Sequence, residues 1–218
     1  MTSENQAGKP GHDIVRLDAQ AVQATVRVVS GISPADLAKP TPCAGWSLGD
    51  LLAHMTVQHD GFAAAAAGDG ADLARWQPRQ AGAGPAGGDP VGEYAAAAGR
   101  ALAAFGADGV LDREFVLPEI SPLLRFSGAE AIGFHFVDYV VHGWDVARSL
   151  GQDFELAPDL LAAALPVARA VPDGEPRRRG LVPFAPGIPV TGDAGVLDQI
   201  VALLGRRPEW PEPAPELP

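Results

Sequence analysis

The stretch from Ser127 to Gly151 most constrains what this chain can fold into, because it sets a row of ionisable side chains in an otherwise apolar helical pattern. A helix that is apolar on nearly every side is normally buried. At about 100° per residue the ionisable side chains fall on one stripe about 80° wide. A buried charge must be paired or bound to a metal ion. We therefore expect the stripe to face an internal cavity, and its members are His135, Asp138, His142 and Asp145.

The spacing of Asp138 and His142 allows both side chains to bind the same ion, because residues four apart lie one helical turn apart on one face. A third ligand must then come from another helix, and His54 is the best candidate. Two histidines and one carboxylate leave a coordination position open, as in catalytic zinc sites. The same ligand set suits iron, nickel or manganese. The alternative is that Asp138 and His142 simply pair with each other.

His54 belongs to a second predicted helix, residues 48–67, for which Ser47 is the expected N-cap. Asp50 stands three residues later, in the position that completes a capping box. On this helix His54 projects beside the apolar face and His59 projects from it. A single histidine in such a place is more often a hydrogen-bonded core residue than a ligand, so both interpretations stay open for each of them.

Further helices are predicted at residues 13–30, 90–106, 158–170 and 194–204 from their apolar periodicity and caps. A short helical turn is expected near residues 34–37 and an extended segment at 111–117. Loops are expected at 68–90, for which a lid is one interpretation, and at 171–192. The chain is therefore expected to be mainly all-α, a four-helix bundle over residues 13–170 followed by a C-terminal extension, 171–218, with a short helix and a proline-rich tail.

The charge of the chain excludes some partners. Its net charge is −11, from 27 acidic and 16 basic residues, which argues against binding to nucleic acid or to an anionic membrane. The single cysteine excludes an intramolecular disulfide. The first residues lack the pattern of a signal peptide, and no apolar run is long enough to span a membrane. We expect a cytoplasmic protein.

The basic run Arg177 to Arg179 is expected in an exposed loop, with anion binding as the alternative.

Two motifs, TPCAGWSLGDLLAHM and FHFVDYVVHGWDVARSLG, resemble the mycothiol-dependent maleylpyruvate isomerase family within the DinB-like four-helix metalloproteins. The segment IPVTGDAGVLDQIVALLGRRPEW is similar to the C-terminal part of the same group, whereas residues 68–126 match poorly. The resemblance implies a DinB-like metal-binding domain. It also implies that His54, Asp138 and His142 bind a divalent ion, foremost zinc, with nickel, iron or manganese as alternatives.

The resemblance further implies a thiol cofactor, mycothiol. The chain departs from the isomerase pattern at Asp138, where the isomerase itself has glutamate. The shorter side chain of aspartate shifts the ion or weakens its binding, so the isomerase activity does not simply carry over.

We expect a divalent-metal-dependent enzyme that acts on a small electrophilic or unsaturated substrate, as a mycothiol-dependent isomerase or a thiol S-transferase. One alternative is a relative recruited to a biosynthetic pathway as a cyclase, epimerase or hydrolase. Another is a non-catalytic protein that binds a metal or a small ligand. His135 and His59 are the candidate catalytic residues, with packed core histidines as the alternative. The expected partner is a small-molecule substrate, and family analogy allows a homodimer.

Four remaining residues have structural interpretations. Asp145 is expected to form a structural bond, to the opposing helix or to the segment near Trp46. Cys43 is expected to be a small packed residue, because no positively charged neighbour is evident in the sequence. Trp46 and Trp144 are expected to anchor the core.

Overall fold

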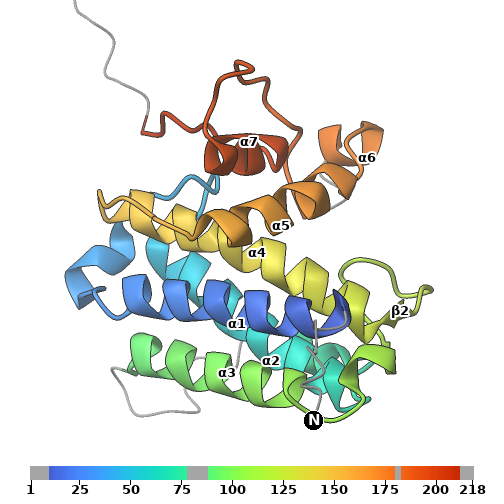
Figure 1. Cartoon of the computed structure of the whole chain (residues 1–218). Helices are drawn as coiled ribbons and strands as arrows, with labels where there is room; N and C mark the ends of the chain where they lie inside the picture. The colour runs from blue at the N-terminus through green and yellow to red at the C-terminus, as the bar shows by residue number, and fades with distance from the viewer. Residues whose placement is uncertain (1–9, 78–87, 180–182, 212–218) are drawn as a thin grey trace, which may run out of the picture.

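The computed structural model describes residues 10–77, 88–179 and 183–211. Long helices run side by side in a bundle, and the C-terminal elements pack along one side of it (Figure 1). Helix α1 packs against α4 and α2 packs against α3, while α1 also contacts α3 and α2 contacts α4. The predicted mainly helical four-helix bundle is thus confirmed. Its helices are α1 (Pro10–Val29), α2 (Leu48–Ala66), α3 (Pro90–Phe105) and α4 (Gly128–Ser149).

The two helices that carry the candidate ligands begin at capping boxes, as predicted. Ser47 accepts a hydrogen bond from the backbone N–H of Asp50, whose carboxylate accepts one from the N–H of Ser47. Ser127 and Glu130 repeat this arrangement at the start of α4. Each box satisfies two backbone donors that a helix start would otherwise leave unpaired. The caps therefore fix where α2 and α4 begin, and with them the direction of every side chain along both helices.

Helix α4 is the buried centre of the bundle, and Gly143 allows it to approach neighbouring elements closely. A Cβ atom at this position would lie 2.4 Å from Cζ of Phe154 and 2.5 Å from Cγ2 of Thr25, which belongs to α1. Both distances are too short for a real Cβ atom, so any other residue here would force these neighbouring side chains to shift. The apolar pattern of the stretch from Ser127 to Gly151 is explained by this burial on nearly all sides.

Short elements connect the long helices. They are η1 (Pro34–Ala38), η2 (Leu73–Trp76), η3 (Val110–Asp112) and a two-stranded antiparallel sheet of β1 (Glu114–Phe115) and β2 (Phe126–Ser127). The extended segment predicted at residues 111–117 is a strand only at β1. In the predicted loop at 68–90, η2 is an unpredicted turn that buries Trp76, and residues 78–87 of that loop lie outside the described residues.

The C-terminal elements are α5 (Pro158–Ala170), α6 (Glu175–Arg178) and α7 (Val196–Leu203), and α7 packs on α5. The prediction that Arg177 lies in an exposed loop is wrong. It is part of α6 and only 3% exposed, and its guanidinium donates hydrogen bonds to the carbonyl oxygens of Val171, Ala185 and Leu203. An arginine can replace water at several carbonyl groups at once, because it has five donors in fixed directions.

The last described residues return to α4. Arg148 of α4 donates hydrogen bonds to the carbonyl oxygens of Pro208 and Trp210. This contact fixes the C-terminal segment beside the helix that carries the ionisable stripe. Within the described residues, no helix has the length and apolar character needed to cross a membrane.

Candidate metal centre

The structure brings together the three side chains predicted as ligands. His54 of α2 and Asp138 and His142 of α4 each present a ligand atom, and these atoms all lie within 4.8 Å of one another. Asp138 Oδ1 lies 3.4 Å from His142 Nε2. The rings of His54 and His142 meet edge to face, with centroids 5.3 Å apart. Two imidazoles and a carboxylate in this arrangement suit a divalent ion with an open coordination position.

The three side chains line a cavity of about 560 Å³. Its walls come from the turn before α2, from α2 and α4, from the connection between β1 and β2, and from the C-terminal segment. Trp46 is one wall: it is 38% exposed, and its ring lies 4.9 Å from that of His54. The prediction of Trp46 as a core anchor is therefore wrong, whereas Trp144 is buried as expected. The lining also includes Cys43, Glu119 and Arg206.

The two histidines differ in protonation. Burial lowers the pKa of His54 to about 4, and the nearby charge of His142 acts in the same direction. His54 is therefore neutral near pH 7, with a nitrogen lone pair available to an ion. Burial alone would lower the pKa of His142 as well, but Asp138 and the hydrogen bond to Asp145 outweigh it and raise the pKa to about 10. An ion that binds here must displace the proton of His142.

Asp145 orients His142. Its Oδ2 lies 2.9 Å from His142 Nδ1, which leaves Nε2 on the side of Asp138. A carboxylate bound to the outer ring nitrogen is the usual support of a metal-binding histidine. The same oxygen accepts hydrogen bonds from Cys43 Sγ at 3.2 Å and from Arg206 at 3.1 Å. Asp145 thus forms the structural bonds expected of it, one of them to the segment near Trp46.

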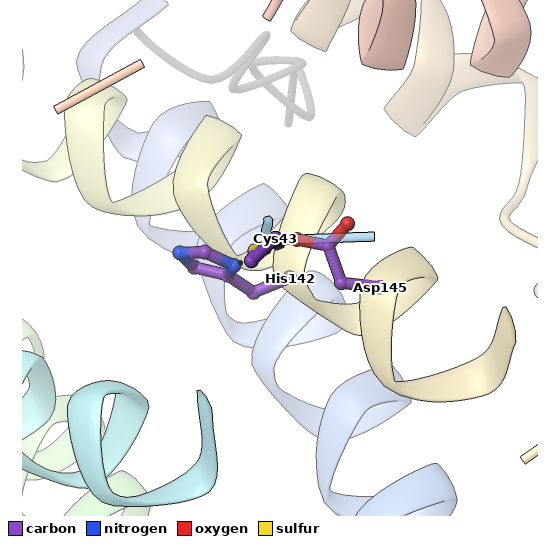
Figure 2. A group of neighbouring side chains, drawn as sticks. All are labelled: Cys43, His142 and Asp145. Carbon is purple, nitrogen blue, oxygen red and sulfur yellow. Dashed lines mark hydrogen bonds and ion pairs between the residues drawn. The ribbon is translucent and has the colours of Figure 1, made fainter. Parts of the chain in front are cut away.

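A second group of ligand types, Cys43, His142 and Asp145, also has its atoms within 4.8 Å of one another (Figure 2). We interpret this group as hydrogen-bonded support rather than as a metal site. Arg206 donates a hydrogen bond to Cys43 Sγ at 3.2 Å as well as to Asp145, so a guanidinium cation already neutralises these groups. The expectation that Cys43 has no positively charged neighbour is wrong, because Arg206 reaches it from 163 residues away in the sequence.

Arg206 and Asp145 form a buried ion pair. Arg206 is 7% exposed and Asp145 is fully buried. Burial would raise the pKa of Asp145, but Arg206 and His142 outweigh it and hold the pKa below its usual range. Asp145 is therefore ionised, and the pair attaches the C-terminal segment to the helix that carries the candidate ligands.

The two candidate catalytic histidines lie together in the bundle interior. His135 Nε2 lies 3.0 Å from His59 Nδ1, and His135 Nδ1 lies 2.6 Å from Oδ1 of Asp18 in α1. All three side chains are fully buried, and none is among the residues that line the cavity of His54. Burial lowers the pKa of His59 and raises that of Asp18. A catalytic role for His135 and His59 stays a prediction.

The sequence did not indicate two further polar residues, of which one lines the cavity and the other supports it. Gln58 of α2 is buried and donates a hydrogen bond of 2.6 Å to Oε2 of Glu119, which lines the cavity. Burial raises the pKa of Glu119, and the bond from Gln58 opposes that shift. Gln58 follows His54 by four residues, so its position one turn along the same face could have been predicted. Glu119 lies in an irregular connection, where no periodicity indicates which way a side chain points.

Comparisons with known proteins identify the family and the fold of the chain. The model of a family described as the mycothiol maleylpyruvate isomerase N-terminal domain matches residues 19–147. Two uncharacterized proteins of Mycobacterium tuberculosis, from strains CDC 1551 / Oshkosh and ATCC 25618 / H37Rv, are each 31% identical to this chain over 189 residues. The matched region covers 86% of this chain and 94% of each relative.

Among solved structures, the crystal structure of the mycothiol-dependent maleylpyruvate isomerase resembles this chain with a TM-score of 0.55. The similarity covers 74% of this chain and 69% of that one, at 13% sequence identity. An identity this low indicates a shared fold and leaves the chemistry to be argued from the residues of each cavity.

Proposed function

Because the chain belongs to the mycothiol maleylpyruvate isomerase N-terminal domain family, we propose that it is a divalent-metal-dependent enzyme that uses a thiol cofactor. We propose mycothiol as the thiol and zinc as the foremost metal. The reaction is an isomerisation or a thiol transfer on a small electrophilic or unsaturated substrate. The observation that carries the proposal is the convergence of His54, Asp138 and His142 on one side of a cavity.

The donor set fits a divalent ion. His54 is neutral near pH 7, Asp138 supplies a negative charge, and His142 turns its Nε2 toward Asp138 because Asp145 engages the other nitrogen. A divalent ion held by these residues would lower the pKa of a thiol and keep it as the nucleophilic thiolate.

The protein itself supplies the binding site around that centre. The cavity volume of about 560 Å³ is within the range of about 300–1,000 Å³ that is usual for small-molecule sites. Trp46 provides an apolar wall beside His54. The C-terminal segment closes another side, and the buried pair of Arg206 and Asp145 fixes it there. These residues bind and orient a substrate and limit the access of water.

The proposal is tested by thiol turnover. Purified protein loaded with zinc is incubated with mycothiol and an unsaturated carbonyl compound, and free thiol and substrate geometry are followed by absorbance and NMR. We expect metal-dependent loss of thiol for a transferase, or a change in double-bond geometry without net thiol loss for an isomerase. Metal-loaded protein that catalyses neither reaction over a panel of electrophiles would contradict thiol chemistry.

A further inference from the structure

Glu119 gives the cavity a carboxyl group that is separate from the three candidate ligands. It lies on the connection between β1 and β2 and lines the same cavity as His54, Asp138 and His142. Gln58 holds Oε2 of its carboxylate at 2.6 Å. Gln58 is buried and stands one turn after His54 on α2, so its hydrogen bond holds the carboxylate of Glu119, itself an exposed residue, at the wall of the cavity.

The charges that line the cavity are unevenly distributed. Glu119 and Asp138 are acidic, and Arg206 is the only lysine or arginine among the described lining residues. The guanidinium of Arg206 is already engaged by Asp145, Cys43 and the carbonyl oxygen of Leu204. A buried guanidinium satisfied in this way has little attraction left for an incoming anion. The described lining therefore offers a substrate carboxylate no unpaired cation.

A bound ion does not reverse this balance. A divalent cation carries two positive charges, Asp138 neutralises one, and a thiolate in the open position neutralises the other. Any additional anionic group on the substrate or on the thiol would face the carboxylate of Glu119. A hydroxyl, amide or ammonium group would instead donate a charge-assisted hydrogen bond to it.

We propose that Glu119 is a specificity-determining residue that selects a thiol or substrate bearing hydrogen-bond donors or positive charge beside the metal centre, and disfavours polyanionic compounds. The inference rests on the proposed function, because it assumes that a thiol occupies the open coordination position. It narrows both the thiol cofactor and the substrate to neutral or cationic compounds.

The test uses the full chain loaded with cobalt(II), whose sulfur-to-metal absorption band reports thiolate binding. Three thiols share a two-carbon frame and differ only in the end group, which is cationic, neutral and anionic in turn: thiocholine, 2-mercaptoethanol and 2-mercaptoethanesulfonate. Each is titrated into the unsubstituted protein and into Glu119→Gln, and for each thiol the ratio of the two dissociation constants is taken. This ratio cancels the intrinsic affinity of each thiol for cobalt.

We expect Glu119→Gln to weaken thiocholine binding and to strengthen sulfonate binding, so that the preference between them changes about tenfold or more, as is typical of an interaction with a charged group. Glu119→Lys should reverse the preference. Glu114→Gln is the matched control, because it removes the same charge from an exposed residue. Glu114 pairs with Ser127 at the start of α4. Ser127 lies about 16 Å from Asp138 along the axis of that helix.

The outcomes separate the two proposals. A sulfur-to-cobalt band whose strength does not depend on thiol charge, or whose charge preference is the same in Glu119→Gln, overturns the role of Glu119 and leaves the thiol-binding centre standing. If cobalt binds but no thiol produces the band, the proposed function is wrong, and this inference falls with it.

Discussion

Replacing Asp145 by alanine should destabilise the protein far more than an average substitution. Asp145 is fully buried and accepts hydrogen bonds from Cys43 and Arg206, besides its bond with His142. Its removal leaves the charge of Arg206, itself 7% exposed, inside the protein without a counter-charge. The perturbation therefore tests whether this ion pair attaches the C-terminal segment to α4.

The expected cost follows from the burial of both partners. Breaking a buried ion pair by removing one partner costs about 3–5 kcal/mol. For a chain of this size each kcal/mol lowers the melting temperature by about 2–4 °C, so a decrease of about 6–20 °C is expected. Urea unfolding followed by circular dichroism measures the free energy directly. The affinity for a divalent ion should also fall about 10- to 100-fold, because His142 loses its orienting partner.

The double variant Asp145→Ala/Arg206→Met separates this explanation from a simple loss of packing. It removes the isolated charge, so we expect it to be more stable than Asp145→Ala alone. A loss of less than about 1 kcal/mol in Asp145→Ala, or a double variant that is less stable than the single one, would refute the reasoning.

Three further predictions concern other parts of the molecule. Gly143→Ala should lower the unfolding free energy by about 1–3 kcal/mol, because the added methyl group meets Phe154 and Thr25; an unchanged urea midpoint would contradict this close packing. Zinc binding near pH 7.5 should release about one proton from His142, whose pKa is raised to about 10, so affinity should rise with pH up to that value; calorimetry in buffers of different ionisation enthalpy measures the proton, and identical heats would argue against it. Asp18→Ala should cost about 1–3 kcal/mol by leaving buried His135 without its hydrogen-bond partner and should leave zinc content unchanged; a variant of normal stability that has lost turnover would instead support catalysis by His135.

Local features of the sequence predicted the helices well. Ser47 with Asp50 and Ser127 with Glu130 form the capping boxes that the sequence predicts, since a cap depends only on residues within one helical turn. Periodicity then placed Asp138 and His142 on one face of α4, and it placed His54 on α2 near the inner side of the bundle. These three residues meet because regular helices convert sequence spacing into direction.

The rest of the site depends on contacts between distant parts of the chain, which periodicity does not encode. Arg206 reaches Cys43 and Asp145 from the segment after α7. Glu119 is directed by its bond to Gln58 within an irregular connection. The burial of Arg177 likewise follows from carbonyl groups that the C-terminal elements bring together.

The metal content of the purified protein tests the central claim most directly. Mass spectrometry of the metals should find about one divalent ion per chain, as for a single site with three protein ligands. His54→Ala, Asp138→Ala and His142→Ala should each lose it, whereas the control Asp153→Ala, at an exposed position, should keep it. Undiminished stoichiometric metal in folded His54→Ala and His142→Ala would contradict the assignment of the centre.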